Sequence, residues 1–201
     1  TRQYYRRRAW GGRWSPAGKR LAWVGDLNVV PELFVDGDGL LGWTRGLDGG
    51  RIASPPSWSP DGKRLVVVES ITHRDRLLLV DVDGGSEAVE LDFDEITHPA
   101  WSPDGGRIAF AANPGGKYEI YQKVSTGAGK DELLLKMPSS IVAVDWSRDG
   151  RFLVYSIADP KTKWDLWLLP LEGERKPVPF LQTQFNELEA QFSPDGRWMA
   201  Y

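Results

Sequence analysis

The chain has 201 residues, a net charge of −3, no cysteine, 22 glycines, 14 prolines and 10 tryptophans. That length suits one domain that buries roughly 70% of the surface of its unfolded chain. The weakly negative charge argues against general adhesion to nucleic acid or acidic membranes, no apolar run approaches the ~18 residues that span a bilayer, and the lack of cysteine excludes disulfides and thiolate chemistry. A chain this rich in glycine, proline and aromatic residues is predicted to form many short strands joined by tight turns.

The first twenty residues are basic. They hold seven Arg or Lys side chains and no acidic one, with Tyr4, Tyr5 and Trp10 interleaved. Such a segment would suit a nucleic-acid arm, but the acidic remainder of the chain would repel phosphates. We therefore interpret it as a solvated edge strand or loop, and we expect no nucleic-acid partner.

One ten-residue phrase recurs along the chain, and its most regular copy is Trp101–Phe110. An aromatic residue precedes Ser-Pro-Asp-Gly, in which proline presets φ and glycine adopts the left-handed conformation of a hairpin bulge. The apolar run that follows alternates its faces as a strand does. Each copy thus predicts a β-hairpin. The copies begin at Trp14, Trp58, Trp101, Trp146 and Phe192, with steps of 44, 43, 45 and 46 residues.

In each of the first four units, three extended segments follow the turn of the phrase, separated by glycine-containing turns. In the fourth unit, Pro177 and Pro179 lack an N–H, so its last strand should lie at an exposed edge. An acid–aliphatic–aromatic triplet recurs in the third strand, and we expect the repeated aliphatic and aromatic residues to pack between neighbouring units. The predicted strands are 21–24, 32–35 and 40–44; 65–69, 77–81 and 88–91; 108–112, 118–123 and 132–135; and 152–157, 164–169 and 177–180.

A period near 44 residues with four strands each time indicates a radial repeat. We therefore predict an all-β fold: a β-propeller of four-stranded antiparallel blades, with about four and a half blades present. Residues 1–201 would form a single partial propeller domain.

The Trp-Ser-Pro-Asp-Gly phrase resembles the WD-like repeat of TolB-type propellers over residues 12–201. Segments such as Asp159-Pro160-Lys161-Thr162 and Phe185-Asn186-Glu187 further resemble the propeller region C-terminal to bacterial Ser/Thr protein kinase domains. The resemblance implies a fragment of a six-bladed ring that acts as a protein-interaction or sensory module of a bacterial envelope or signalling protein, in the periplasm or otherwise outside the cytoplasm. It carries no catalytic residue onto this chain. Ala17 and Arg148 depart from the phrase, and each is expected to weaken its turn locally.

Few residues invite a chemical interpretation. Gly37–Gly42 fits the dinucleotide pattern G-x-G-x-x-G, but a strand follows it instead of a helix. The two histidines, His73 and His98, each lack a second histidine at metal spacing. We therefore expect no metal and no cofactor.

His98 is the more informative of the two histidines because it lies three residues before Trp101, where an innermost strand would meet the central channel. The equivalent positions elsewhere are Gly11, Pro55, Ala143 and Glu189. His98 and Glu189 on one rim are candidate ligand- or cation-binding residues; alternatively, they are solvated or cap a turn.

Three functions remain open. The leading one is a non-catalytic propeller that binds a protein or peptide partner. The second is the substrate-gating propeller of a prolyl-oligopeptidase-like serine peptidase whose catalytic domain lies outside this chain, and the third, a lactonase-like metal propeller, lacks converging acidic residues. An incomplete ring would also expose blade edges, through which the fragment is expected to oligomerise.

Overall fold

The computed structural model describes residues 9–26, 31–37, 40–44, 50–72, 74–91, 93–193 and 195–201. Most of the basic leading segment, His73, Asp92 and part of the Gly37–Gly42 turn lie outside these residues. Every regular element in the described part is a strand. That part contains no helix long and apolar enough to cross a bilayer.

The strands form four sheets and a final hairpin. Blade 1 contains β1 (Ala9–Trp14), β2 (Leu21–Asp26), β3 (Pro31–Gly37) and β4 (Leu40–Thr44). Blade 2 contains β5 (Arg51–Ile52), β6 (Ser57–Trp58), β7 (Arg64–Ile71), β8 (Arg74–Asp81) and β9 (Ser86–Val89). Blade 3 contains β10 (Ile96–Trp101), β11 (Arg107–Ala112), β12 (Glu119–Val124) and β13 (Glu132–Leu135). Blade 4 contains β14 (Ile141–Trp146), β15 (Phe152–Asp159), β16 (Lys163–Pro170) and β17 (Val178–Leu181), and the hairpin contains β18 (Gln191–Phe192) and β19 (Met199–Ala200).

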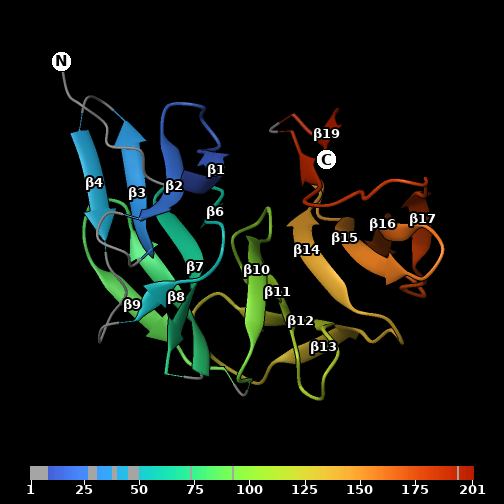
Figure 1. Ribbon diagram of the computed structural model, residues 1–201. Coiled ribbons are helices and arrows are strands. Elements are labelled where there is room, and N and C mark those ends of the chain that lie inside the picture. Colours follow the sequence, from blue (N-terminus) through green and yellow to red (C-terminus); the bar gives the residue numbers. More distant parts are fainter. Residues whose placement is uncertain are drawn as a thin grey trace.

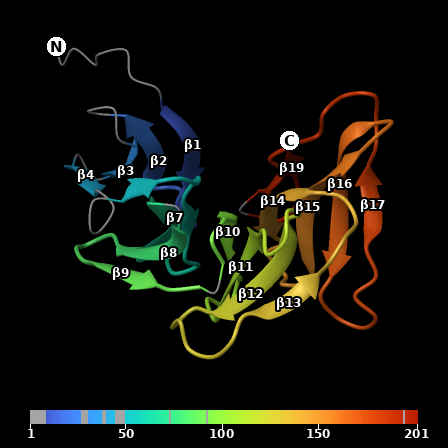
Figure 2. The same cartoon turned by 60° about the horizontal axis from the view of Figure 1, so that its bottom comes forward.

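Within each blade the strands pair antiparallel in chain order. The blades follow one another in an arc, and the first strand of each lies nearest the common centre (Figures 1 and 2). These inner strands contact one another, as β1 contacts β6 and β10 contacts β14. We call this centre the hub. The predicted propeller of four-stranded antiparallel blades is confirmed.

Blade 2 departs from the plan at its inner strand, which is divided into β5 and β6, both paired with β7. Pro55 and Pro56 stand between the two pieces and have no N–H to donate, so the ladder is interrupted there. The strands predicted from the sequence do not include β5. The Ser54 hydroxyl accepts a hydrogen bond from the backbone N–H of Val68 at 2.8 Å, so this donor of β7 keeps a partner.

The core lies between the blades because each sheet buries both of its faces. In β7, Leu65 and Val67 pack toward blade 1, whereas Val66 and Val68 pack toward blade 3. The strand alternation thus supplies two separate apolar layers. Similar layers lie between blades 3 and 4 and between blade 4 and the final hairpin. The predicted aliphatic packing between units is confirmed.

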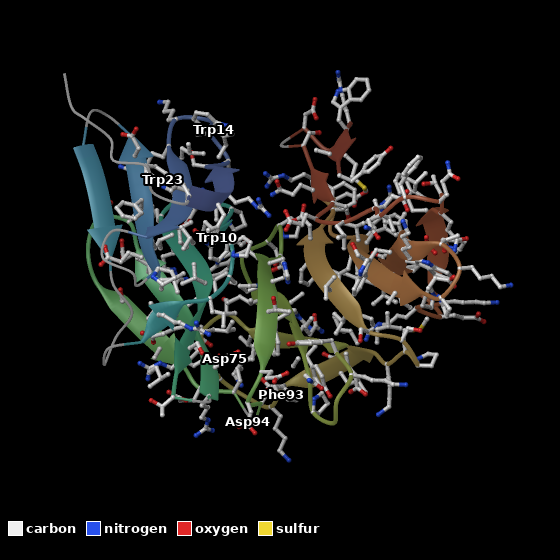
Figure 3. The ribbon with its side chains drawn as sticks, in the orientation of Figure 1. Trp10, Trp14, Trp23, Asp75, Phe93 and Asp94 are labelled. Atoms are coloured by element: carbon white, nitrogen blue, oxygen red, sulfur yellow. The ribbon has the colours of Figure 1, made fainter. Side chains whose placement is uncertain are left out.

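The tryptophan of each phrase packs on the preceding blade. Trp58, Trp101 and Trp146 join the layers that contain blades 1, 2 and 3, respectively, and at most 8% of each is exposed. Trp14, on the first blade, is 63% exposed; Figure 3 shows it with the other side chains of β1.

The phrase forms the same hydrogen-bonded turn in blades 2, 3 and 4. In blade 3 the Ser102 hydroxyl donates to Asp104 at 2.6 Å and accepts from the N–H of Arg107, while the Asp104 carboxylate accepts from the N–H of Gly106. Such local bonds favour a turn over continued ladder pairing.

The two departures have different consequences. The turn that contains Arg148 keeps the whole set, with the Ser147 hydroxyl 2.7 Å from Asp149, so no weakening is visible. The turn at Ala17 keeps the bond from Arg20 N–H to Ser15, but it has no carboxylate to accept the others.

The acid of the third-strand triplet is buried. Asp165 is fully buried, and its Oδ2 accepts from Thr162 at 2.7 Å and from Gln182 at 3.0 Å. Gln182 follows β17, so the carboxylate ties the third strand to the chain that leaves the blade. The acids therefore have a structural role. The last strand, β17, is mostly exposed, as Pro177 and Pro179 predicted.

Candidate functional site at the hub

The inner strands are distorted where they meet the hub. The pairing of β1 with β2 shifts register between Trp10 and Arg13, and that of β10 with β11 shifts between Thr97 and Ala100. At the position three residues before the aromatic residue, Gly11, His98 and Glu189 all have left-handed backbone, with φ of 67°, 50° and 57°. Glycine takes this conformation freely, whereas His and Glu do so at a cost of order 1–2 kcal/mol.

The hub encloses a cavity of about 390 Å³. Its charged and polar walls come from different blades: Arg13 from β1, His98 from β10, Asp145 from β14, and Glu189 just before β18. The structure thus brings both predicted candidates, His98 and Glu189, to the same cavity. Pro55, at the equivalent position in blade 2, also lines it and would lie 2.9 Å from a side-chain Cβ at Gly11.

Sequence reasoning missed Arg13 and Asp145. Each lies one residue before the aromatic residue of its phrase, a position held by Ser57, Ala100 and Gln191 in the other units. Comparing that position across the five copies would have shown two opposite charges among small or neutral residues. That signal was present, but only the position three residues before the aromatic residue was compared.

Asp145 is held by the final hairpin. Its Oδ2 accepts a hydrogen bond from the backbone N–H of Phe192 at 2.8 Å, across the space between blade 4 and β18. Burial raises the pKa of Asp145, while this bond, the N–H of Trp146 and the charges of Arg13 and Arg148 act in the opposite direction. The carboxylate therefore joins two inner strands and faces a cation.

Arg13 carries the opposite charge across the cavity. Burial lowers its pKa, and the carboxylates of Asp145 and Glu189 oppose that effect. In the part of the chain that the structure describes, no carboxylate lies within 4.0 Å of Arg13; its NH1 instead donates to the carbonyl of Gly12 at 3.1 Å. The remaining guanidinium donors of Arg13 are therefore available to a ligand.

His98 lies between these charges. Burial lowers its pKa, Glu189 raises it, and Arg13 lowers it further. Its Nδ1 lies 2.5 Å from the hydroxyl of Thr97, which fixes the ring. At neutral pH the imidazole is thus predominantly uncharged and has Nε2 for a further hydrogen bond.

The serine hydroxyls of the cavity are already engaged. Ser102 and Ser193 bond the aspartates of their own turns, and Ser57 accepts from the N–H of Trp101. Within the described ranges no group of three His, Asp or Glu side chains is arranged to hold a metal ion. The cavity therefore offers hydrogen-bond donors and acceptors on a wall of proline and tryptophan, an arrangement suited to binding.

Comparison with known proteins identifies the family. The profile of the TolB beta propeller domain matches residues 6–201. No curated protein matches the chain.

Three solved structures illustrate the similarity. TolB from Acinetobacter baumannii superposes with a TM-score of 0.82 at 21% identity, over 99% of this chain and 49% of that one. A putative TolB from Agrobacterium tumefaciens gives 0.80 at 18% identity, over 96% of this chain and 68% of that one. A prolyl endopeptidase gives 0.64 at 17% identity, over 93% and 31%. The chain spans about half the length of the first of these structures, and these likenesses establish the fold.

Proposed function

This chain belongs to the TolB β-propeller domain family, and on that premise we propose that it is a protein-binding module without catalytic activity of its own. The hub cavity is the proposed contact with an exposed segment of a partner protein. His98 and Glu189 are proposed as binding residues, with Arg13 and Asp145 beside them. The parent would be a bacterial envelope or signalling protein with this domain outside the cytoplasm.

The observation that carries the proposal is the backbone at His98 and Glu189. Both hold left-handed conformations that cost free energy, and both face one cavity from different blades. Strained backbone persists where the surrounding fold imposes it, and it is concentrated at binding and active sites. Gly11, at the equivalent position of blade 1, adopts the same conformation without that cost.

The chemistry of the cavity favours a peptide. Arg13 and His98 offer donors, Asp145 and Glu189 offer acceptors, and Trp58 and other aromatic and proline residues form the apolar wall. An extended peptide presents N–H and C=O groups together with apolar side chains, so it can satisfy both kinds of partner. A ligand with charge of one sign would meet a like charge in this cavity.

The similarity to a prolyl endopeptidase supports a second candidate. In that case the propeller would gate access to a hydrolase domain elsewhere in the parent protein. The hub would then meet the peptide substrate, and a binding partner would not be needed.

Photocrosslinking in the full-length protein in its native host distinguishes the candidates. A photoreactive phenylalanine analogue replaces Trp198, a 73% exposed residue of the hub, and separately Phe180, a 48% exposed residue on the outer strand β17. We expect the analogue at the hub position to form an adduct with one protein, and the analogue at the outer position to form none. The yield of the hub adduct should fall in the double variant His98→Ala and Glu189→Ala. Adducts of equal yield at both positions would contradict the proposal. Hydrolysis of proline-containing peptides by the purified full-length protein would favour the peptidase.

A further inference from the structure

The turns of the phrase pack against one another around the hub. A Cβ placed on the turn glycine of one blade would lie against the second turn residue of the preceding blade: Gly62 on Pro16 at 3.8 Å, and Gly105 on Pro60 at 3.6 Å. A Cβ placed on Gly196 would likewise lie 3.5 Å from the Cβ of Arg148. A Cβ on Gly150 would have no neighbour within 4 Å, so among these four turn contacts the one between blades 3 and 4 is open.

A cleft of about 570 Å³ lies at that open contact. The two turns that fail to meet contribute Pro103 and Gly150 to its wall, and Leu134 and Leu171 add apolar surface. Three arginines from both blades also line it: Arg107, Arg148 and Arg175. We call this space the blade 3–4 cleft.

The carboxylates around the cleft are largely used by the protein. Asp104 accepts from Ser102 and Gly106 of its own turn, and Asp149 accepts from the Ser147 hydroxyl and from Arg151. These contacts saturate much of the acceptor capacity of the turn aspartates. Their charges remain close to the cleft.

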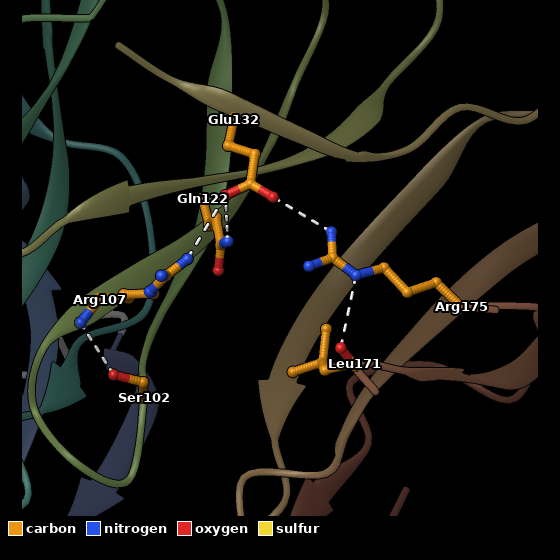
Figure 4. A network of polar contacts seen from close by, with 6 residues as sticks. All are labelled: Ser102, Arg107, Gln122, Glu132, Leu171 and Arg175. Atoms are coloured by element: carbon orange, nitrogen blue, oxygen red, sulfur yellow. Dashed lines mark hydrogen bonds and ion pairs between the residues drawn. The ribbon is translucent and has the colours of Figure 1, made fainter. Parts of the chain in front are cut away.

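Glu132 is the shared acceptor of the cleft. It receives hydrogen bonds from Gln122 at 2.7 Å, Arg107 at 3.4 Å and Arg175 at 3.1 Å, as Figure 4 shows. Gln122 is only 5% exposed, and its hydrogen bond fixes the position of the Glu132 carboxylate. Arg175 crosses from blade 4 to reach it from a left-handed backbone of φ 48°. One carboxylate thus serves two guanidinium groups. The Nε of Arg175 also donates to the carbonyl of Leu171 at 3.4 Å, and each guanidinium has further N–H donors beyond these bonds.

Arg148 stands where the four other copies of the phrase have proline. Its Cβ and Cγ keep the contact with Gly196 that proline makes elsewhere, and its turn keeps every hydrogen bond. The guanidinium makes no hydrogen bond or salt bridge with any residue that the structure describes. The substitution therefore adds a cation between the cleft and the hub cavity, which Arg148 also lines, at no visible cost to the turn.

We propose that the blade 3–4 cleft binds a carboxylate of an acidic peptide segment, held by Arg148 together with the free N–H groups of Arg107 and Arg175. This inference rests on the proposed function, because the segment would belong to the same protein partner. Guanidinium groups bind carboxylates and phosphates alike through paired hydrogen bonds. The nearby charges of Asp104, Asp149 and Glu172 oppose a doubly charged phosphate more strongly than a singly charged carboxylate.

Calorimetric titration of this chain with a capped tetraglutamate peptide tests the proposal, with a capped tetraglutamine peptide as the uncharged probe. We expect tetraglutamate alone to bind. Arg148→Pro should weaken that binding about tenfold, the size of one lost hydrogen bond between charged groups. The melting temperature should barely change, because the four other copies of the phrase have proline at this position: Pro16, Pro60, Pro103 and Pro194. Pro60→Arg is the matched control: it adds the same cation where Gly105 closes the turn contact, and it should leave the affinity unchanged.

Equal binding of tetraglutamate to the parent chain and to Arg148→Pro would overturn the proposal. So would equal binding of the two peptides, or displacement of tetraglutamate by an equimolar amount of inorganic phosphate. Arg148 lines both spaces, whereas His98 and Glu189 line the hub cavity alone and take no part in this titration. If photocrosslinking gives the hub adduct but tetraglutamate does not bind, the cleft proposal is rejected and the proposed function stands. If tetraglutamate binds but no hub adduct forms, the hub is rejected as the contact with the partner.

Discussion

The indole Nε1 of Trp58 donates a hydrogen bond to the backbone carbonyl of Arg13 at 2.9 Å. The bond joins the inner strand of blade 2 to that of blade 1, beside the charged residue of the hub. Trp58 therefore connects two neighbouring blades as well as filling the layer between them, whereas the Nε1 of Trp146 donates to Gly150 of its own turn. The position of Arg13 in the cavity depends on this contact.

Replacing Trp58 tests that connection. Trp58→Ala should lower the free energy of unfolding by about 3–5 kcal/mol, because it removes a buried aromatic side chain and leaves the carbonyl of Arg13 without its donor. Trp14→Ala, at the same position of the phrase but 63% exposed, should cost less than about 1 kcal/mol. Urea denaturation of both variants measures the difference. Equal losses would contradict the assignment of Trp58 to the layer between blades.

The turn at Ala17 should be improvable. Ala17→Asp supplies the carboxylate that accepts from the serine hydroxyl and from a backbone N–H in the other turns, so it should raise the free energy of unfolding by about 1 kcal/mol. Asp104→Ala removes the same pair of bonds from blade 3 and should cost a similar amount. A destabilising Ala17→Asp, measured by denaturant unfolding, would show that the first turn is not equivalent to the others.

The turn aspartates predict a loss of stability in acid. The hydroxyl of Ser147, together with the N–H groups of Arg151, lowers the pKa of Asp149 to about 2, and corresponding serines lower the pKa of Asp61, Asp104 and Asp195. A carboxyl whose pKa is lower in the folded chain than in the unfolded one stabilises the fold above the unfolded value of about 3.9. That contribution is lost as the pH falls from about 4 towards 2.

Carbon-detected NMR titration of the aspartate side chains measures this directly. Asp149 should titrate near pH 2, and in Asp149→Asn the decline of stability between pH 4 and 2 should be shallower than in the parent chain. An ordinary titration of Asp149 near pH 3.9 would contradict the bonded turn.

The strained backbone at Glu189 predicts a conflict between stability and binding. Glu189→Gly should raise the free energy of unfolding by about 0.5–1 kcal/mol relative to Glu189→Ala, because both remove the carboxylate but only glycine adopts φ 57° without strain. Both variants should lose partner binding at the hub. If thermal and urea unfolding show glycine to be no better than alanine, the backbone there is not under strain.

The phrase itself was enough to predict the sheets, because Ser-Pro-Asp-Gly fixes each turn locally and the following apolar run fixes the strand faces. The same reasoning placed His98 and Glu189 at equivalent inner positions. Their common cavity with Arg13 and Asp145 depends on how far each blade rotates from the last, which no single copy encodes. The missed strand β5 pairs with β7 and is separated from β6 by Pro55 and Pro56, which a local pattern predicts as loop.

The blade 3–4 cleft also depends on how neighbouring blades are placed, which a single copy of the phrase does not encode. Pro103 belongs to the most regular copy of the phrase and Gly150 to the copy that carries Arg148, and their turns do not meet. Arg148 departs from the proline of the phrase, but the hydrogen bonds of its turn are unaffected. Its relation to Arg107 and Arg175 arises only once the two blades stand side by side.

The radial arrangement of the blades is the claim on which the hub, the cavity and the cleft all depend, and the distance between the first and last inner strands tests it most directly. The chain has no cysteine, so Trp14→Cys and Trp198→Cys, both exposed and both at the hub cavity, give a single spin-labelled pair. Double electron–electron resonance should report a distance clearly shorter than the ~40 Å that five sheets stacked about 10 Å apart in a line would give between their ends. A distance of about 40 Å or more would contradict the shared hub and, with it, the proposed binding site.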